Sequence, residues 1–241
     1  MKFTVRGILA AVFVLLVAGV CVRLGLWQLD RLKERRARNE AVGTATAQRP
    51  LVLDATTAAA VTSDPDAYVW RRVRVQGRYA PTGAVVLRAR AREGNPGVHI
   101  VAPLVLGDGR VVMVNRGWAP SPDAATIDRS ALRPDTGEVT VTGVLLPVET
   151  RPDGGMPAGR VGDDTTYRRL DLAALRARAQ GEVLPVHVQQ LADGAVPDPP
   201  IPVPLPEMGE GNHLSYAVQW FSFAAIAVIG FGVVALRRRR T

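Results

Sequence analysis

The residues with the clearest capacity for chemistry lie at the start of the last apolar segment, NHLSYAVQWFSFA (residues 212–224). On a helix, His213, Tyr216 and Trp220 are spaced i, i+3 and i+7 and share a face. A neutral imidazole is the usual nitrogen ligand of haem iron, and aromatic neighbours suit a planar apolar cofactor. The same residues also fit an aromatic belt at the headgroup level of a bilayer. The pattern alone leaves both interpretations open.

A second group lies in the middle of the chain, in VNRGWAP (residues 114–120). Arg116 and Trp118 flank a glycine at a strand end, where an arginine can hold a propionate or a partner's carboxylate. The alternative is a structural arginine paired with an acid, next to a packed tryptophan. His99 and His187 lie within apolar strand patterns, which is typical of core or edge residues.

Motifs of the common enzyme classes are absent from the sequence. It has no glycine-rich phosphate loop, no HExxH and no CxxC, and its serines lack a nucleophile-elbow context. Asp163 and Asp164 form an adjacent acidic pair that a solvated loop explains. The single cysteine, Cys21, excludes a disulfide framework. We therefore expect a protein without catalytic activity.

Two apolar segments near the ends of the chain are long enough to cross a membrane, and the second contains His213, Tyr216 and Trp220 at its start. Residues 214–236 contain no group that is charged at neutral pH, and about 20 apolar residues cross a bilayer as a helix. The first segment reaches spanning length over residues 8–29, because Arg23 can extend its head to the interface. Trp27 and Gln28, at the outer end of the first span, should lie at the depth of His213.

A removable leader is the alternative for the N-terminus. No small-x-small cleavage site is obvious there, and Val20 is a poor residue before a lipoprotein cysteine. We expect an uncleaved anchor.

The net charge of +8 belongs to the membrane flanks. Seven of the 30 basic residues border the apolar segments, so the region between has 23 basic and 22 acidic residues and a net charge of +1. This argues against a nucleic-acid partner. The arginines at 237–240 oppose Glu207 and Glu210 across the second span, which predicts that both termini are cytoplasmic, although the basic stretch 30–40 opposes export.

The middle region reads as strands between residues 68 and 148, with a hairpin turn at 107–109. The stretch 30–40 extends the first span as a polar helix, Asp171 caps an amphipathic helix, and a late strand covers 182–190. The expected fold is therefore two transmembrane α-helices flanking a mostly antiparallel β domain, a small barrel or sandwich with one or two short helices. The predicted division is 8–29, 30–211, 212–236 and a basic tail 237–241.

Three motifs carry a resemblance to a known family: LGLWQLDR (24–31), VNRGWAP and NHLSYAVQWFSFA, in that order. The chain resembles the SURF1 (Shy1) family of cytochrome c oxidase assembly proteins over nearly its whole length. Departures are Gly211, where a second asparagine is common, and Glu34 with Arg35, where an aromatic residue and a lysine are usual.

The resemblance implies a non-enzymatic plasma-membrane factor for aa3-type oxidase, which assists haem a insertion or stabilises the haem a site in subunit I. The implied partners are subunit I, the lipid bilayer and the haem a synthesis machinery. In that role His213 would be an axial ligand and Trp27 and Trp220 pocket walls, while Arg116 would contact a propionate or a partner. Tyr216 and Trp118 also fall on motif positions. The alternative is a structural partner of subunit I that binds no haem.

Overall fold

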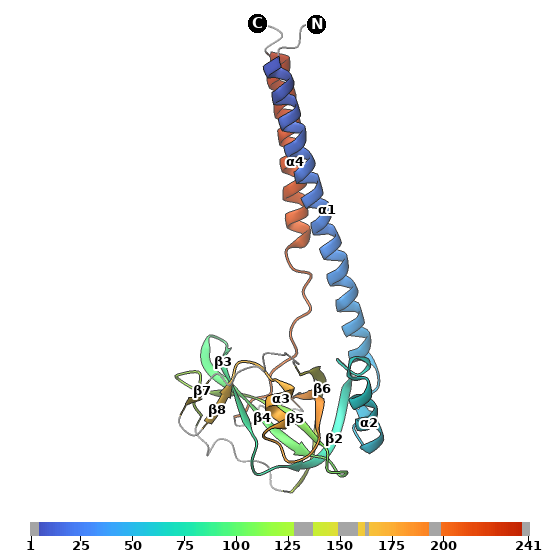
Figure 1. Cartoon of the computed structure of the whole chain (residues 1–241), viewed down its shortest axis with the longest axis vertical. Helices are drawn as coiled ribbons and strands as arrows, with labels where there is room; N and C mark the ends of the chain where they lie inside the picture. The colour runs from blue at the N-terminus through green and yellow to red at the C-terminus, as the bar shows by residue number, and fades with distance from the viewer. Residues whose placement is uncertain (1–4, 128–136, 149–158, 162–163, 193–198, 238–241) are drawn as a thin grey trace. The chain divides into compact units, whose positions relative to one another are not determined.

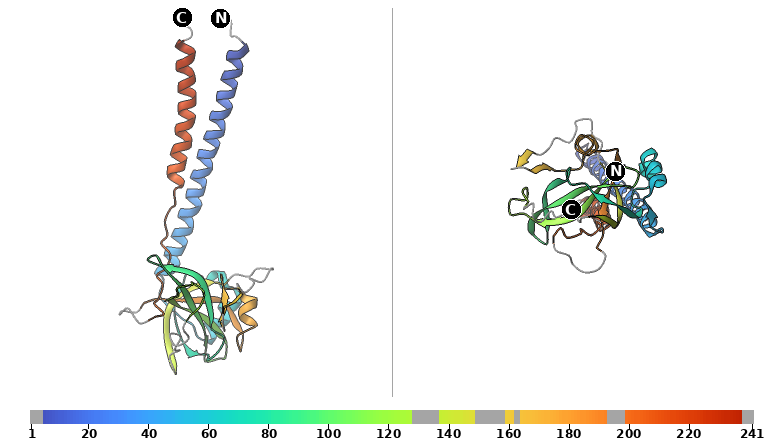
Figure 2. Two further views of the ribbon diagram at one scale, coloured as in Figure 1. Left: turned by 90° about the vertical axis from the view of Figure 1, so that its left-hand side faces the viewer. Right: turned by 90° about the horizontal axis from the view of Figure 1, so that it is seen from below.

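The chain forms two compact units, shown in Figure 1 and Figure 2. The computed structural model describes residues 5–127, 137–148, 159–161, 164–192 and 199–237. The first unit comprises residues 1–42 and 207–241, and the second comprises residues 43–206. Asp163 and the arginines at 238–240 lie outside the described residues.

Two long helices form most of the first unit: α1 (Val5–Ala47), up to residue 42, and α4 (His213–Arg237). They run antiparallel and side by side (Figure 1; Figure 2). Both are long and apolar enough to cross a membrane, so this is a membrane protein. The polar stretch 30–40 continues α1 without a break, which confirms the prediction for it.

The two helices meet along a narrow stripe on each, the seam, in which the less exposed residues follow a seven-residue repeat. On α1 the less exposed positions alternate at spacings of three and four: Ala11, Val14, Ala18, Cys21, Gly25, Gln28 and Leu32. On α4 the matching positions are His213, Ala217, Trp220, Ala224, Ala227 and Phe231. Such spacing keeps one stripe of each helix against its neighbour, and small side chains let the backbones approach. Most of the remaining circumference is exposed, as at Phe13 and Ile226, each 67% exposed.

The second unit is built on a nine-stranded sheet with the order β1-β2-β6-β9-β5-β4-β3-β8-β7. An additional β2–β4 pairing closes β2, β6, β9, β5 and β4 into a barrel. The strands are β1 (Leu51–Val52), β2 (Arg72–Tyr79), β3 (Val85–Arg92), β4 (Asn95–Val105), β5 (Val111–Pro120), β6 (Glu138–Pro147), β7 (Gly159–Val161), β8 (Asp164–Tyr167) and β9 (Val183–Gln190). Three short helices complete the unit: α2 (Ala55–Ser63), η1 (Pro65–Ala67) and α3 (Leu172–Arg176).

Alternating side chains divide the barrel wall into an inner and an outer face. Val73 and Val75 on β2 are fully buried, whereas Arg72 and Arg74, which alternate with them, are exposed. The inner valines and leucines form one core with Val61 of α2. A second cluster packs α3 against β3, β5 and β9.

The structure confirms the two flanking helices and the β domain, and it resolves the barrel-or-sandwich alternative as a barrel. Asp171 caps α3 by accepting a hydrogen bond from the Ala174 N–H at 3.0 Å, as predicted. The hairpin expected at 107–109 joins β4 to β5. Helix α2 was not predicted, and β9 pairs with β5 in parallel rather than antiparallel.

Two histidines in the barrel wall should make its stability depend on pH. Burial lowers the pKa of His99 to about 4, with a contribution from Arg90, and burial lowers the pKa of His187 to about 4. The unfolded chain protonates a histidine near pH 6.5, so unfolding takes up protons below that pH. Stability is therefore fully present above pH 6.5 and falls as pH drops toward 4, by up to about 3 kcal/mol per histidine.

We expect the melting temperature of the full-length protein in detergent to fall between pH 7 and 5. Tryptophan fluorescence during thermal unfolding would measure it. His99→Gln should flatten the dependence, because it removes one titrating group. An equal slope in wild type and variant would show that His99 does not contribute.

Candidate functional site

His213 is the first residue of α4 and lies where that helix meets α1. Its Nδ1 is 2.9 Å from Oε1 of Gln28, which α1 contributes. The Tyr216 N–H donates to the Asn212 carbonyl at 3.0 Å, so the first turn forms directly beside this contact. The sequence placed Gln28 and His213 at one depth, and the structure confirms that placement.

The second ring nitrogen of His213 faces a different environment. Gly211, at φ +71°, lies beside it, and a Cβ there would be 3.7 Å from Nε2. Within the described part of the chain, Nε2 makes no hydrogen bond. The imidazole is thus held through one nitrogen while the other is next to a residue without a side chain.

The aromatic residues around His213 are not all on one side of α4. Trp220 packs toward α1, against Ala18, Cys21 and Ala224. Tyr216 lies on the flank of the helix and is 47% exposed. A residue three positions on is rotated by about 60° from His213, whereas one seven positions on is almost above it. The i, i+3, i+7 spacing therefore brings Trp220, but not Tyr216, into the seam.

Trp27 precedes Gln28 on α1 and is 43% exposed. The Arg31 guanidinium carbon lies 5.6 Å from the centre of its ring, a cation–π distance. Trp27 is therefore a partly exposed aromatic residue that directly precedes Gln28 and has Arg31 over its ring.

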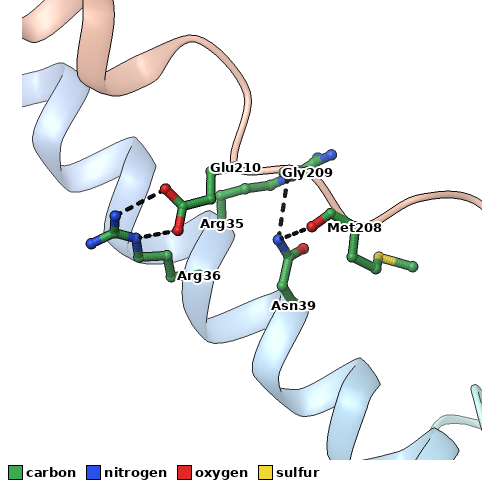
Figure 3. A network of polar contacts seen from close by, with 6 residues as sticks. All are labelled: Arg35, Arg36, Asn39, Met208, Gly209 and Glu210. Atoms are coloured by element: carbon green, nitrogen blue, oxygen red, sulfur yellow. Dashed lines mark hydrogen bonds and ion pairs between the residues drawn. The ribbon is translucent and has the colours of Figure 1, made fainter.

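A polar clamp joins α1 to the segment that leads into α4 (Figure 3). Arg36 donates to both carboxylate oxygens of Glu210, at 2.8 and 2.9 Å. Arg35 and Asn39 donate to backbone carbonyls of residues 208–209 at 3.0 Å. The hydrogen bonds from Arg36 lower the pKa of the Glu210 carboxyl. No local sequence pattern indicates this clamp, because its members are about 170 positions apart in the chain.

The VNRGW segment occupies a β-bulge in the second unit. Ile100 pairs with Gly117 and Val101 pairs with Asn115, which leaves Arg116 as the extra residue. A bulge redirects the side chain of its extra residue. Here the Arg116 guanidinium carbon lies 5.0 Å from the centre of the Tyr79 ring.

Trp118 is 8% exposed and anchors the proline-rich segment that follows β9. The backbone N–H of Trp118 donates to the Ile201 carbonyl, and the backbone N–H of Ile201 donates to the Trp118 carbonyl, each at 2.7 Å. Gly117 is required beside this bridge, because a Cβ at its φ of +132° would overlap the Ile201 carbonyl. Gly97 is required against the Trp118 indole for the same reason.

Asn115 connects the bulge to the same segment. Its amide N–H donates to Gln189 Oε1 at 2.9 Å, and its carbonyl accepts from the Gly117 N–H at 3.2 Å. The Gln189 amide in turn donates to the Val203 carbonyl at 3.2 Å. Asn115 Nδ2 also lies 3.3 Å from His99 Nδ1. Sequence reasoning missed Asn115 and Gln189, although a polar residue inside an apolar strand run was a usable signal.

The predicted site residues thus fall into two groups. His213, Trp220, Tyr216 and Trp27 belong to the first unit, and Arg116 and Trp118 belong to the second. Among the described residues, no cluster of three or more histidine, cysteine or acidic side chains could hold a metal ion. Any iron bound by His213 would therefore need its other ligands from a porphyrin or a partner.

Comparison with known proteins identifies the family of this chain. The SURF1 family model matches residues 15–225, which include the barrel, most of α1 and the first half of α4. The chain belongs to the SURF1 family. This family is known for oxidase assembly and is generally non-catalytic.

Relatives are spread widely. An uncharacterised SURF1-like protein of Mycobacterium bovis is 29% identical over 220 residues, covering 90% of this chain and 79% of the relative. A SURF1-like protein of Rickettsia felis is 24% identical over 226 residues, covering 90% and 92%. A SURF1-like protein of Drosophila melanogaster is 29% identical over 245 residues, covering 88% and 73%.

The helix seam depends on Gly25. A Cβ at this position would lie 2.7 Å from Phe221 Cε1, so Gly25→Val should force the helices apart. We expect the yield of an oxidative cross-link between Cys21 and an Ala224→Cys variant to fall several-fold. Gly19→Val is the matched control, because a Cβ at Gly19 meets nothing within 4 Å. Equal cross-linking in both variants would contradict the close approach.

The bridge between Trp118 and Ile201 depends on Gly117. Gly117→Ala should lower the free energy of unfolding by about 1–3 kcal/mol, because the backbone conformation disfavours a side chain and the new methyl meets the Ile201 carbonyl. Chemical unfolding of the full chain in detergent would measure this. Gly107→Ala, in a turn with open space around it, should change little. Equal loss in both would argue against the bridge.

Proposed function

We propose that this protein assists assembly of an aa3-type cytochrome oxidase by holding haem a at His213 before it reaches the haem a site of subunit I. Family membership supports the oxidase-assembly part of this proposal. The observation that carries the haem part is the His213–Gln28 contact, which holds the imidazole through Nδ1, while no other described residue forms a hydrogen bond to Nε2.

The donor set fits the proposed cargo. Neutral imidazole is a common axial ligand of haem iron, and a ligating histidine usually donates its other N–H to an oxygen acceptor. Gln28 Oε1 is such an acceptor, at 2.9 Å. Trp27, the residue before Gln28, adds a partly exposed aromatic surface. When bound, the haem would supply an iron that accepts the nitrogen lone pair.

The protein's own residues then have distinct tasks. His213 donates the lone pair, and Gln28 fixes the direction of the ring. Trp27 and Trp220 would border the porphyrin, Trp27 from its exposed ring and Trp220 from the seam against α1. The clamp from Arg36 to Glu210 fixes the segment immediately before His213. Nothing in this set forms or breaks a covalent bond, as a non-enzymatic role requires.

We further propose that both termini are cytoplasmic and that the barrel domain faces outward from the plasma membrane. The antiparallel helix pair puts the two ends of the chain on one side, and arginines follow α4 there. Arg116, in the outer domain, would contact an acidic group of subunit I. The haem a synthesis machinery would then be the source of the cargo.

His213→Ala should abolish haem a retention. Purification from cells that make haem a, followed by an absorption spectrum, should give at least a tenfold lower haem content in the variant. His99→Gln is the control, because it removes a histidine from the barrel and should leave the spectrum unchanged.

Wild-type protein without haem, or an unchanged spectrum in His213→Ala, would reject the ligand role. If subunit I still co-purified with His213→Ala at the wild-type level, the structural-partner alternative would be favoured.

A further inference from the structure

Gln28 is the only polar side chain on the α1 seam between Ala11 and Leu32. Gln28 is part-buried and follows Gly25 by one turn on this stripe, and a buried amide costs free energy unless it is hydrogen-bonded. Its described hydrogen bond is the one to His213 Nδ1, at 2.9 Å. The low polarity around a helix seam strengthens such a bond and makes its loss more costly.

We infer that Gln28 is a positioning residue that selects the tautomer of His213, with its amide oxygen accepting the Nδ1–H so that the lone pair is on Nε2. A neutral imidazole carries one proton, so a bond donated from Nδ1 leaves Nε2 as the acceptor. The ligand role assigned to Nε2 rests on the proposed function. The tautomer itself is a property of the protein without haem.

The surroundings of Nε2 agree with this assignment. Gly211 lies close to Nε2, and it has no side chain to cover that nitrogen. Its φ of +71° is a conformation that asparagine also adopts, and asparagine would bring a Cβ to 3.7 Å from Nε2. The glycine therefore leaves open a position at which a side chain would be in van der Waals contact with the Nε2 side of the ring.

The clamp keeps the two partners in register. Residues 208–210 are tied to Arg35, Arg36 and Asn39, two to three turns beyond Gln28 on α1. His213 follows this segment by three residues, so its distance from Gln28 is fixed from both sides: by the clamp before it and by the helix seam after it. The Gln28–His213 bond is thus held by backbone placement and not by side-chain reach alone.

Nitrogen NMR on the haem-free, full-length protein in lipid nanodiscs tests the assignment. With ¹⁵N-labelled histidine at pH 8, the spectrum should show His213 with the proton on Nδ1, its signals identified by their loss in His213→Ala. Gln28→Leu should move the proton toward Nε2, because the acceptor is gone. Gln28→Glu should restore the Nδ1–H form, because a carboxylate only accepts. A wild-type His213 with its proton on Nε2 would overturn the inference.

Haem binding provides the second readout. Titration with ferric haem should show about tenfold weaker binding in Gln28→Leu and near wild-type binding in Gln28→Glu, the usual size of an effect exerted through a ligand's hydrogen-bond partner. Gln219→Leu is the matched control, because it removes an exposed amide from α4. Cross-linking between Cys21 and an Ala224→Cys variant verifies that each variant keeps its helix seam.

The two hypotheses fail separately. If His213→Ala binds haem as wild type does, the proposed function is wrong while the tautomer result still stands on the NMR spectra. If Gln28→Leu changes neither the His213 tautomer nor the haem affinity, the positioning role of Gln28 is wrong even though His213 still binds haem.

Discussion

The approach of α1 to α4 at Gly25 is the constraint on which the candidate site depends. Phe221 occupies the space that a side chain at residue 25 would need, and Gln28 follows one turn later on the same stripe. An amide side chain is short, so Gln28 reaches Nδ1 of His213 only because the backbones are this close. The hydrogen bond between Gln28 and His213, at 2.9 Å, therefore depends on the packing of Gly25 against Phe221 one turn away. A larger residue at position 25 would act on the imidazole without contacting it.

In the barrel, a corresponding constraint is imposed by buried polar groups. Asn115 and Gln189 are nearly inaccessible to solvent, and each satisfies the other while bonding to a backbone group. Buried amides are tolerated when their donors and acceptors are used. Here they fix the bulge that contains Arg116 and the path of residues 201–203. The VNRGW segment thus has a structural task that does not involve any ligand: it holds the chain that returns to the second helix.

Much of the architecture could be predicted, because it depends on local pattern. Alternation around Val73 and Val75 marks a barrel strand, Asp171 marks a helix start, and a glycine-rich turn marks the β4–β5 hairpin. Helix α2 escaped prediction because its run of alanines and threonines has no clear amphipathic period, and its burial comes from Ala58 and Val61 alone. The parallel pairing of β5 with β9 connects segments about 70 residues apart, which no local pattern can encode.

The candidate site divides in the same way. The depth of Gln28 relative to His213 follows from counting residues along two spans, and it was predicted. The spacing predicted that His213, Tyr216 and Trp220 share a face; in the structure Trp220 packs toward α1, whereas Tyr216 is rotated toward the flank. Sequence spacing could not show which nitrogen of His213 is hydrogen-bonded, because the bond to Gln28 is a contact between distant residues. The clamp from Arg36 to Glu210 could not be predicted for the same reason.

Most of the circumference of the helix pair is apolar and exposed. Two helices cannot shield each other, so bulky side chains such as Phe13 and Ile226 point away from the seam over most of the length of both spans. Acyl chains cover such a surface as readily as another apolar helix does. A larger membrane protein could therefore replace the surrounding lipid on either helix without breaking a single contact along the seam, and could later be replaced by lipid again at little cost.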